Sequence, residues 1–172
     1  MPTRVITIPG IASRATLKWC RLLADLTARR PEWRAFLAHV VAGVDGNDRT
    51  ATAYACWRWV HRNIRYHREP GEIVQSPAAT VRLGIGDCDD QSTLINAMFE
   101  GLRLPNRFAL AVLMPGGDVG LEPEGGARLG GRAYHIFAQV KLDGRWVCAD
   151  TIHPRLAFGQ DPRTFDGGTT WE

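Results

Sequence analysis

The sequence predicts an α+β fold in a single domain over 1–172. Up to Pro105 the apolar residues recur at helical spacing, and beyond it they alternate along three short segments. A chain of 172 residues, 45% of them hydrophobic, is long enough for one ordinary core. We therefore expect a helical part over 1–105, a sheet part over 106–157 and an irregular tail over 158–172.

Three helices are expected in the first seventy residues. The first begins at Ser13, the second begins at Pro31 and stops at Gly43, and the third follows a turn at 45–48 and ends before Pro70. Their tryptophans are expected in the core. Their apolar faces comprise, in turn, Trp19, Leu22, Leu23 and Leu26; Trp33, Phe36, Leu37, Val40 and Val41; and Ala53, Cys56, Trp57, Val60 and Ile64.

Two further helices follow. Ser76 and Pro77 are typical of a helix start, and this short helix should end at Gly84. Asp87 is a candidate N-cap for a longer helix that closes at Gly101. The apolar face of this longer helix is Leu94, Ile95, Met98 and Leu102.

Three strands are expected after Pro105, at 107–114, 133–142 and 145–152. Asp143-Gly144 is a strong hairpin signal between the last two. The segment 115–132 contains seven glycines and is too long for a simple turn, so we expect a loop beside a site.

The hairpin register predicts a polar pair. With a two-residue turn, Phe137 faces Asp150 and His135 faces Ile152, so His135 and Asp150 are diagonal neighbours on one face, ~7 Å apart at Cα. A bulge at Gly144 would shift the register by one residue and separate them. The opposite face is apolar and holds Ile136, Ala138, Val140, Leu142, Val147 and Ala149.

Among the four cysteines, only Cys88 has an unusual position. Cys20 and Cys56 lie within helical patterns, where a small buried hydrophobic residue is the expected role, and no spacing fits a zinc site. Cys88 lies in the first turn of its helix, where the backbone favours a thiolate by ~0.3–1 kcal/mol. The flanking carboxylates Asp87, Asp89 and Asp90 oppose ionisation. A neighbouring imidazolium from His135, oriented by Asp150, would stabilise the thiolate.

Each of these residues also has a structural alternative. Cys88 could be a structural thiol, His135 a half-buried ring and Asp150 the end of a strand. A metal site of the helix-mouth aspartates with a histidine is a further alternative. The stretch lacks EF-hand spacing and the HExxH pattern, so we expect no metal and no cofactor.

The stretches "GDCDD" (86–90) and "YHIFAQVKLDGRWVCAD" (134–150), in the order Cys, His, Asp, resemble the transglutaminase-like superfamily of papain-related cysteine enzymes. The stretches "WRWVHRNIRY" and "EIVQSPAATVRLGIGDCDDQ" are similar to a subset found in bacteria and tailed phages. The resemblance covers about 49–154.

This resemblance implies a papain-like, transglutaminase-core fold, with the nucleophile helix packed on an antiparallel sheet, and acyl transfer on amides. It implies that Cys88 is the nucleophile, His135 the general base and Asp150 the orienting acid. The backbone N–H of Cys88 is one oxyanion donor. Gln75 is a candidate for the second, with a surface position as its alternative. The chain has no room for the extra β domains of animal transglutaminases and no recognisable calcium loop.

The expected function is a small thiol peptidase or amidase, phage-associated in one form of the hypothesis, acting on a protein or peptide. The alternatives are a transglutaminase that joins glutamine to amines and a catalytically idle binding or assembly module. The scattered charges, 21 basic and 18 acidic, favour no nucleic-acid partner. No stretch reaches the ~20 apolar residues of a membrane span, and the start does not resemble a signal peptide. We expect a cytoplasmic protein, virion-associated if phage-encoded; the sequence indicates no oligomeric state.

Overall fold

The computed structural model describes residues 5–7, 13–67, 73–113, 128–129, 132–152 and 154–162, with side chains for 16–67, 73–109, 135–152 and 154–162. The helices in this part are α1 (Ser13–Ala28), α2 (Pro31–Val40), α3 (Arg49–Asn63), α4 (Pro77–Leu83) and α5 (Cys88–Gly101). The strands are β1 (Val5–Thr7), β2 (Arg65–Tyr66), β3 (Ile73–Gln75), β4 (Ile85–Gly86), β5 (Asn106–Leu113), β6 (Arg128–Leu129), β7 (Arg132–Leu142) and β8 (Arg145–Cys148).

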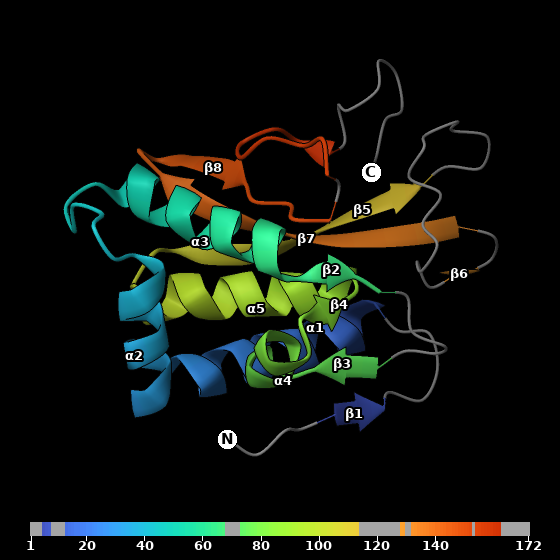
Figure 1. Ribbon diagram of the computed structural model, residues 1–172. Coiled ribbons are helices and arrows are strands. Elements are labelled where there is room, and N and C mark those ends of the chain that lie inside the picture. Colours follow the sequence, from blue (N-terminus) through green and yellow to red (C-terminus); the bar gives the residue numbers. More distant parts are fainter. Residues whose placement is uncertain are drawn as a thin grey trace.

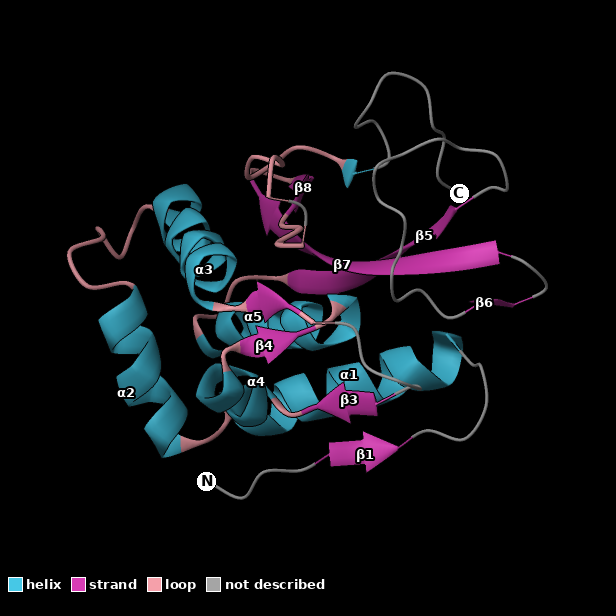
Figure 2. Cartoon of the chain, turned by 45° about the vertical axis from the view of Figure 1, so that its right-hand side comes forward, coloured by secondary structure: helices cyan, strands magenta, loops and turns pink. Residues whose placement is uncertain are grey.

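The α+β prediction is confirmed, and α5 lies at the centre of the fold. Figures 1 and 2 show α5 between the sheet that contains β5 and β7 on one side and α1 on the other. The shorter helix α4 and the helix α3 also pack against it. No helix among the described residues is both long enough and apolar enough to cross a bilayer.

The main sheet is built around β7. The strand β5 pairs antiparallel with β7 from Asn106↔Val140 to Leu113↔Ala133, and β6 and β8 each pair antiparallel with part of β7. The β7–β8 hairpin has the predicted two-residue turn, with positive φ at Asp143 and Gly144, as the primed hairpin turns require. β8 is shorter than predicted: it ends at Cys148, and the chain then leaves the ladder.

Two further two-stranded pairings were not predicted. β1 pairs antiparallel with β3, and β2 pairs parallel with β4. Each of these strands has only two or three residues. A segment this short shows no alternation, so its pairing depends on tertiary contacts.

The helices begin at the predicted signals, while α2 ends at Val40, before the predicted stop at Gly43. Asp48 and Ser76 cap α3 and α4 with their side chains, and Gly84 ends α4 in the left-handed conformation. The predicted faces of α2, α3 and α5 lie in or against one core, and Cys20 and Cys56 are buried as expected. Large buried side chains of this core include Trp33, Leu37, Trp57, Ile64, Leu94, Ile95, Met98, Phe99, Leu104 and Leu142.

The predicted apolar face of α1 is wrong. Trp19, Leu22 and Leu26 are 39%, 44% and 43% exposed, while Leu23 is buried. The buried face of the helix is instead made of Thr16, Cys20, Leu23, Ala24, Thr27 and Ala28. This face packs against α5, and its small side chains allow the two helices to approach closely.

Two predicted segments fall largely outside the described residues. They are the glycine-rich segment 115–132, apart from β6 and Arg132, and the tail beyond 162.

Candidate active site

Cys88 is the first residue of α5. The Asp87 carboxylate caps the helix by accepting hydrogen bonds from the backbone N–H groups of Asp89 (3.2 Å) and Asp90 (3.4 Å). This is the N-cap predicted from the sequence. The N–H of a residue at this position has no acceptor within the helix, so Cys88 can offer it to a ligand.

The surroundings of Cys88 favour the neutral thiol. Burial raises the pKa of Cys88 well above its ordinary value, and the carboxylates of Asp87 and Asp89 raise it further. A hydrogen bond from the backbone of Ile136 to the sulfur acts in the opposite direction. Formation of a thiolate therefore requires a cation beside the sulfur or a base that takes its proton.

His135 and Asp150 form the contact that the hairpin register predicted. His135 Nε2 lies 2.6 Å from Asp150 Oδ2, and the two residues are only 8% and 2% exposed. The second carboxylate oxygen of Asp150 accepts a hydrogen bond from the Ile152 backbone N–H at 2.8 Å. The Phe137 ring stacks on the imidazole with the centroids 5.9 Å apart. The position of the imidazole is therefore closely defined.

The first two turns of α5 lie against β7 beside His135. The sulfur of Cys88 is hydrogen-bonded to the backbone of Ile136, the residue after His135. One turn further along the helix, the Ser92 hydroxyl donates to the Ile136 carbonyl at 3.0 Å. The thiol-bearing helix mouth and the imidazole-bearing strand are thus neighbours, although 47 positions separate Cys88 from His135 in the sequence.

The model of the transglutaminase-like superfamily matches residues 34–151, more than half of the chain. The chain belongs to this superfamily. No curated protein matches the sequence.

Two solved structures are similar to this superfamily member. One is a candidate cysteine protease from Cytophaga hutchinsonii, with a TM-score of 0.54 and 17% identity over 90% of this chain and 50% of that chain. The other is a candidate protease from Parabacteroides distasonis, with a TM-score of 0.51 and 14% identity over 77% of this chain and 26% of that chain. The present chain therefore spans half the length of the first protein and about a quarter of the second. At these identities the likeness shows a shared fold.

Gln75, the candidate second oxyanion donor, lies in β3 and is 2% exposed, so the surface alternative is wrong. Its backbone N–H donates to Asp90 Oδ1 at 2.6 Å and its amide Nε2 donates to Asp90 Oδ2 at 2.8 Å. Donation to an oxyanion stays a prediction.

Sequence reasoning missed the residues that hold Asp150 from α3. The Trp57 indole Nε1 donates to the Asp150 carbonyl at 2.6 Å, and His61 Nδ1 lies 3.4 Å from the Thr151 carbonyl. The two rings stack with their centroids 4.8 Å apart. The sequence identified Trp57 as a core residue, and it is, but nothing local indicates that its polar edge reaches a carbonyl 93 positions away.

The helix-mouth aspartates come close together. One oxygen from each of Asp87, Asp89 and Asp90 lies within 4.8 Å of the others. Asp87 already accepts from the helix backbone and Asp90 from Gln75, so backbone and amide donors account for part of this acidic cluster. The metal site stays an alternative interpretation of these three carboxylates.

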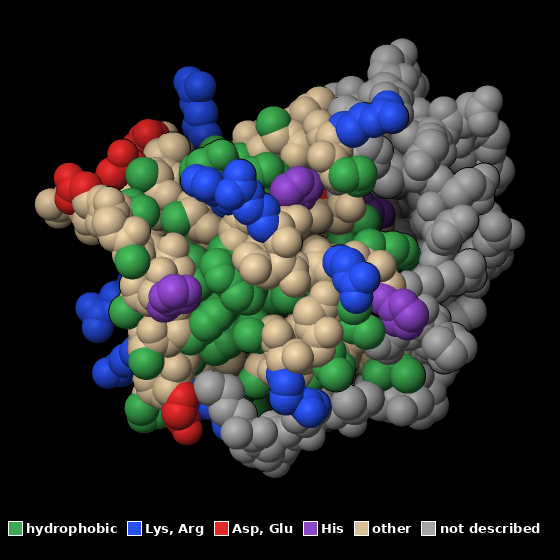
Figure 3. Space-filling view, in the orientation of Figure 1, with side chains coloured by type: hydrophobic (Ala, Val, Ile, Leu, Met, Phe, Trp, Pro, Cys, Tyr) green, Lys and Arg blue, Asp and Glu red, His purple; other side chains and the backbone are tan. Residues whose placement is uncertain are grey.

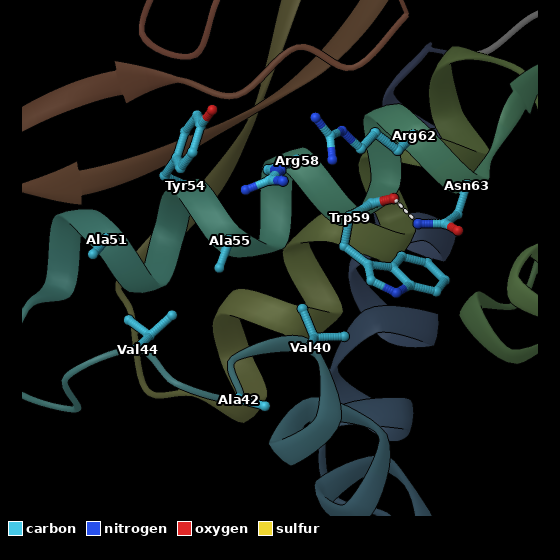
Figure 4. Close-up of a pocket in the computed structure, with 10 residues that line it drawn as sticks. All are labelled: Val40, Ala42, Val44, Ala51, Tyr54, Ala55, Arg58, Trp59, Arg62 and Asn63. Atoms are coloured by element: carbon cyan, nitrogen blue, oxygen red, sulfur yellow. Dashed lines mark hydrogen bonds between the residues drawn. The ribbon is translucent and has the colours of Figure 1, made fainter.

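A groove of about 400 Å³ lies away from Cys88, between the α2–α3 connection and α3. In Figure 4, Val40, Ala42 and Val44 face α3, while Arg58 and Arg62 extend from that helix. Figure 3 shows hydrophobic side chains gathered on this side of the molecule with basic groups around them. The residues that line the groove include neither Cys88, His135 nor Asp150, so it is separate from the candidate active site.

Proposed function

We propose that the chain is a cysteine-dependent enzyme that transfers acyl groups from amides, in its simplest form a small thiol peptidase or amidase. The observation that carries the proposal is the short His135–Asp150 contact on the strand against which the Cys88 helix mouth packs. A binding module needs none of these three side chains in this arrangement. Membership of the superfamily adds support from outside the site.

The proposed reaction has two stages. In the first, the Cys88 sulfur attacks the amide carbonyl carbon, and His135 takes the thiol proton and transfers it to the departing amine. In the second, His135 takes a proton from a water molecule whose oxygen attacks the thioester carbonyl carbon. The C–S bond then breaks, and the imidazolium returns the proton to the sulfur, which releases the acid and the free thiol. Because Nε2 is bonded to Asp150, Nδ1 is the ring nitrogen that would exchange protons with the sulfur.

The electrostatics make His135 essential to this mechanism. Burial and the carboxylates of Asp87, Asp89 and Asp150 raise the pKa of Cys88, so the thiol does not ionise unaided near neutral pH. An imidazolium formed by proton transfer offsets these carboxylates, and Asp150 stabilises that cation. The developing oxyanion would be bound by the N–H of Cys88, with Gln75 as the candidate second donor.

The first test is the rate of Cys88 alkylation by iodoacetamide as a function of pH. We expect rapid labelling below pH ~8.5, the ordinary range of a free thiol. His135→Ala should shift labelling to higher pH, because burial and the nearby carboxylates raise the pKa of Cys88 and only the Ile136 hydrogen bond is then left to oppose them. Cys20 and Cys56 are internal controls: burial raises the pKa of both, to about 12 for Cys56, so they should label very slowly. Equal profiles for wild type and His135→Ala would contradict the proposal and favour the idle module.

The second test follows the fate of the acyl group. The protein is incubated with a peptide library and a fluorescent amine, with Cys88→Ala as the control. Cleavage that disappears in Cys88→Ala, with thermal stability nearly unchanged, is the expected result. Amine incorporation without cleavage would instead favour a transglutaminase. A phage enzyme that acts in virion assembly or entry is a narrower form of the proposal and predicts cleavage in the same assay.

A further inference from the structure

We propose that Gln91 and Thr151 are a positioning pair that holds Asp150 in place relative to Cys88; this inference rests on the proposed function. Gln91 lies three residues after Cys88 on α5, and Thr151 directly follows Asp150. The Thr151 hydroxyl donates to Gln91 Oε1 at 2.9 Å, and both side chains are buried. One hydrogen bond therefore joins the helix of the nucleophile to the segment of the acid.

The segment 150–152, which carries the acid, depends on such an anchor because the backbone ladder of the sheet ends before it. The last paired residues of β7 and β8 are Gln139 and Cys148, and one further backbone bond runs from the Ala149 N–H to the Ala138 carbonyl. Asp150 and Thr151 lie beyond that bond. The hydrogen bond from the Ile152 N–H to Asp150 lies within the segment, so it cannot fix the segment relative to α5.

The orientation of the Gln91 amide is determined by its other partner. Gln91 Nε2 donates to the Gly86 carbonyl at 3.0 Å. A carbonyl oxygen can only accept, so the amide nitrogen must face Gly86 and the amide oxygen must face Thr151. The side chain thus connects the residue two positions before Cys88 with the residue that follows Asp150.

Two further contacts come from α3, one from Trp57 and one from His61, whose Nδ1 lies 3.4 Å from the Thr151 carbonyl. The Trp57 indole bonds the Asp150 carbonyl, but Trp57 is also a large core residue, so its removal would damage the fold as well. Loss of the Thr151 hydroxyl is a smaller change. If the segment moves, the His135–Asp150 contact at 2.6 Å lengthens or rotates, and the imidazole no longer accepts the Cys88 proton efficiently.

The test compares Thr151→Val, which removes the hydroxyl and keeps the branched shape, with Thr151→Ser, which keeps the hydroxyl. Thr93→Val is the matched control, because the buried Thr93 hydroxyl has its partners at the Asp89 carbonyl (2.6 Å) and the Cys20 sulfur on α1, away from Asp150. Cys88 alkylation is measured against pH, together with the melting temperature. Thr151→Val should slow alkylation at pH 7 about tenfold and move its profile toward that of His135→Ala. Thr151→Ser should stay within about twofold of wild type, and Thr93→Val should melt earlier with an unchanged profile.

Three results would overturn the inference. Thr151→Val could melt earlier and keep the wild-type profile, which would make the bond a structural one. Thr93→Val could shift the profile as much as Thr151→Val, which would make the effect a general one. Wild type and His135→Ala could share one pH profile of Cys88 alkylation. That result would refute the proposed function, and the positioning role depends on that function. The comparison of wild type with His135→Ala therefore precedes the Thr151 variants.

Discussion

The helices α5 and α1 lie side by side, yet α5 is buried on all sides over most of its length while α1 leaves several large apolar side chains exposed. In α5 every residue from Asp89 to Phe99 is buried, polar ones included. In α1 the large side chains of Trp19, Leu22 and Leu26 are the exposed ones. Apolar periodicity alone would have assigned α1 the clearer inward face.

The polar residues of α5 are accommodated because they have partners. Ser92 bonds the carbonyl of Ile136, Thr93 bonds the carbonyl of Asp89, and the Asp90 carboxylate accepts two hydrogen bonds from Gln75. A buried polar group is costly only when it loses its hydrogen bonds. α1 shows the converse: small residues face its neighbour because a central helix leaves little room, and the large apolar ones remain outside. The elements that surround a helix therefore determine which of its residues are buried, more than the residue types do.

Asp90→Ala should have the largest effect on stability. Asp90 is fully buried, and its loss leaves the buried Gln75 N–H without its acceptor. We expect a loss of about 3 kcal/mol in the free energy of unfolding, measured with urea. The control on α1 is Asp25→Ala, which breaks a half-exposed pair with Arg21 at 3.5 Å and should cost less than about 0.5 kcal/mol. Equal losses of unfolding free energy in Asp90→Ala and Asp25→Ala would mean that the buried Asp90–Gln75 contact contributes no more to stability than the partly exposed Arg21–Asp25 pair.

Leu23→Ala and Leu22→Ala test the orientation of α1 with the same chemical change at adjacent positions. Leu23 is 4% exposed and packs near Cys20 and Val74, so its truncation should cost about 2–3 kcal/mol. Leu22 is 44% exposed, so its truncation should change stability by less than about 0.5 kcal/mol. The reverse order in urea unfolding would show that the predicted face, not the observed one, is buried.

Gly86→Ala should have a smaller effect, at the mouth of α5. A Cβ at Gly86 would lie 2.8 Å from Asp90 Cβ and 3.2 Å from Thr80 Cγ2. We expect a loss of about 2 kcal/mol, because both neighbours are buried and cannot move aside easily. Gly46→Ala is the control: nothing lies within 4 Å of its added Cβ, and its change should be neutral or slightly stabilising. A melting temperature for Gly86→Ala equal to that of wild type would show that the close approach is not needed.

Much of the candidate site follows from short-range rules. The cap at Asp87 places Cys88 at a helix N-terminus, and the Asp143-Gly144 turn sets the register that brings His135 onto Asp150. Each rule depends on a few consecutive residues, because caps and tight turns are local hydrogen-bonding problems. The family resemblance then assigned roles to residues that these rules had already placed.

The sequence was enough for the helix starts and the hairpin register, since local backbone geometry decides both. It also predicted the contact of His135 with Asp150, although contacts from α3 and α5 hold the segment that carries Asp150. Only the tertiary structure decided which face of α1 is buried. It also decided that Asp90 accepts hydrogen bonds from Gln75 and that Gln91 accepts one from Thr151. The last two contacts join positions 15 and 60 residues apart. A side chain's own neighbours along the chain contain no information about such a partner, because the packing of distant elements brings the two together.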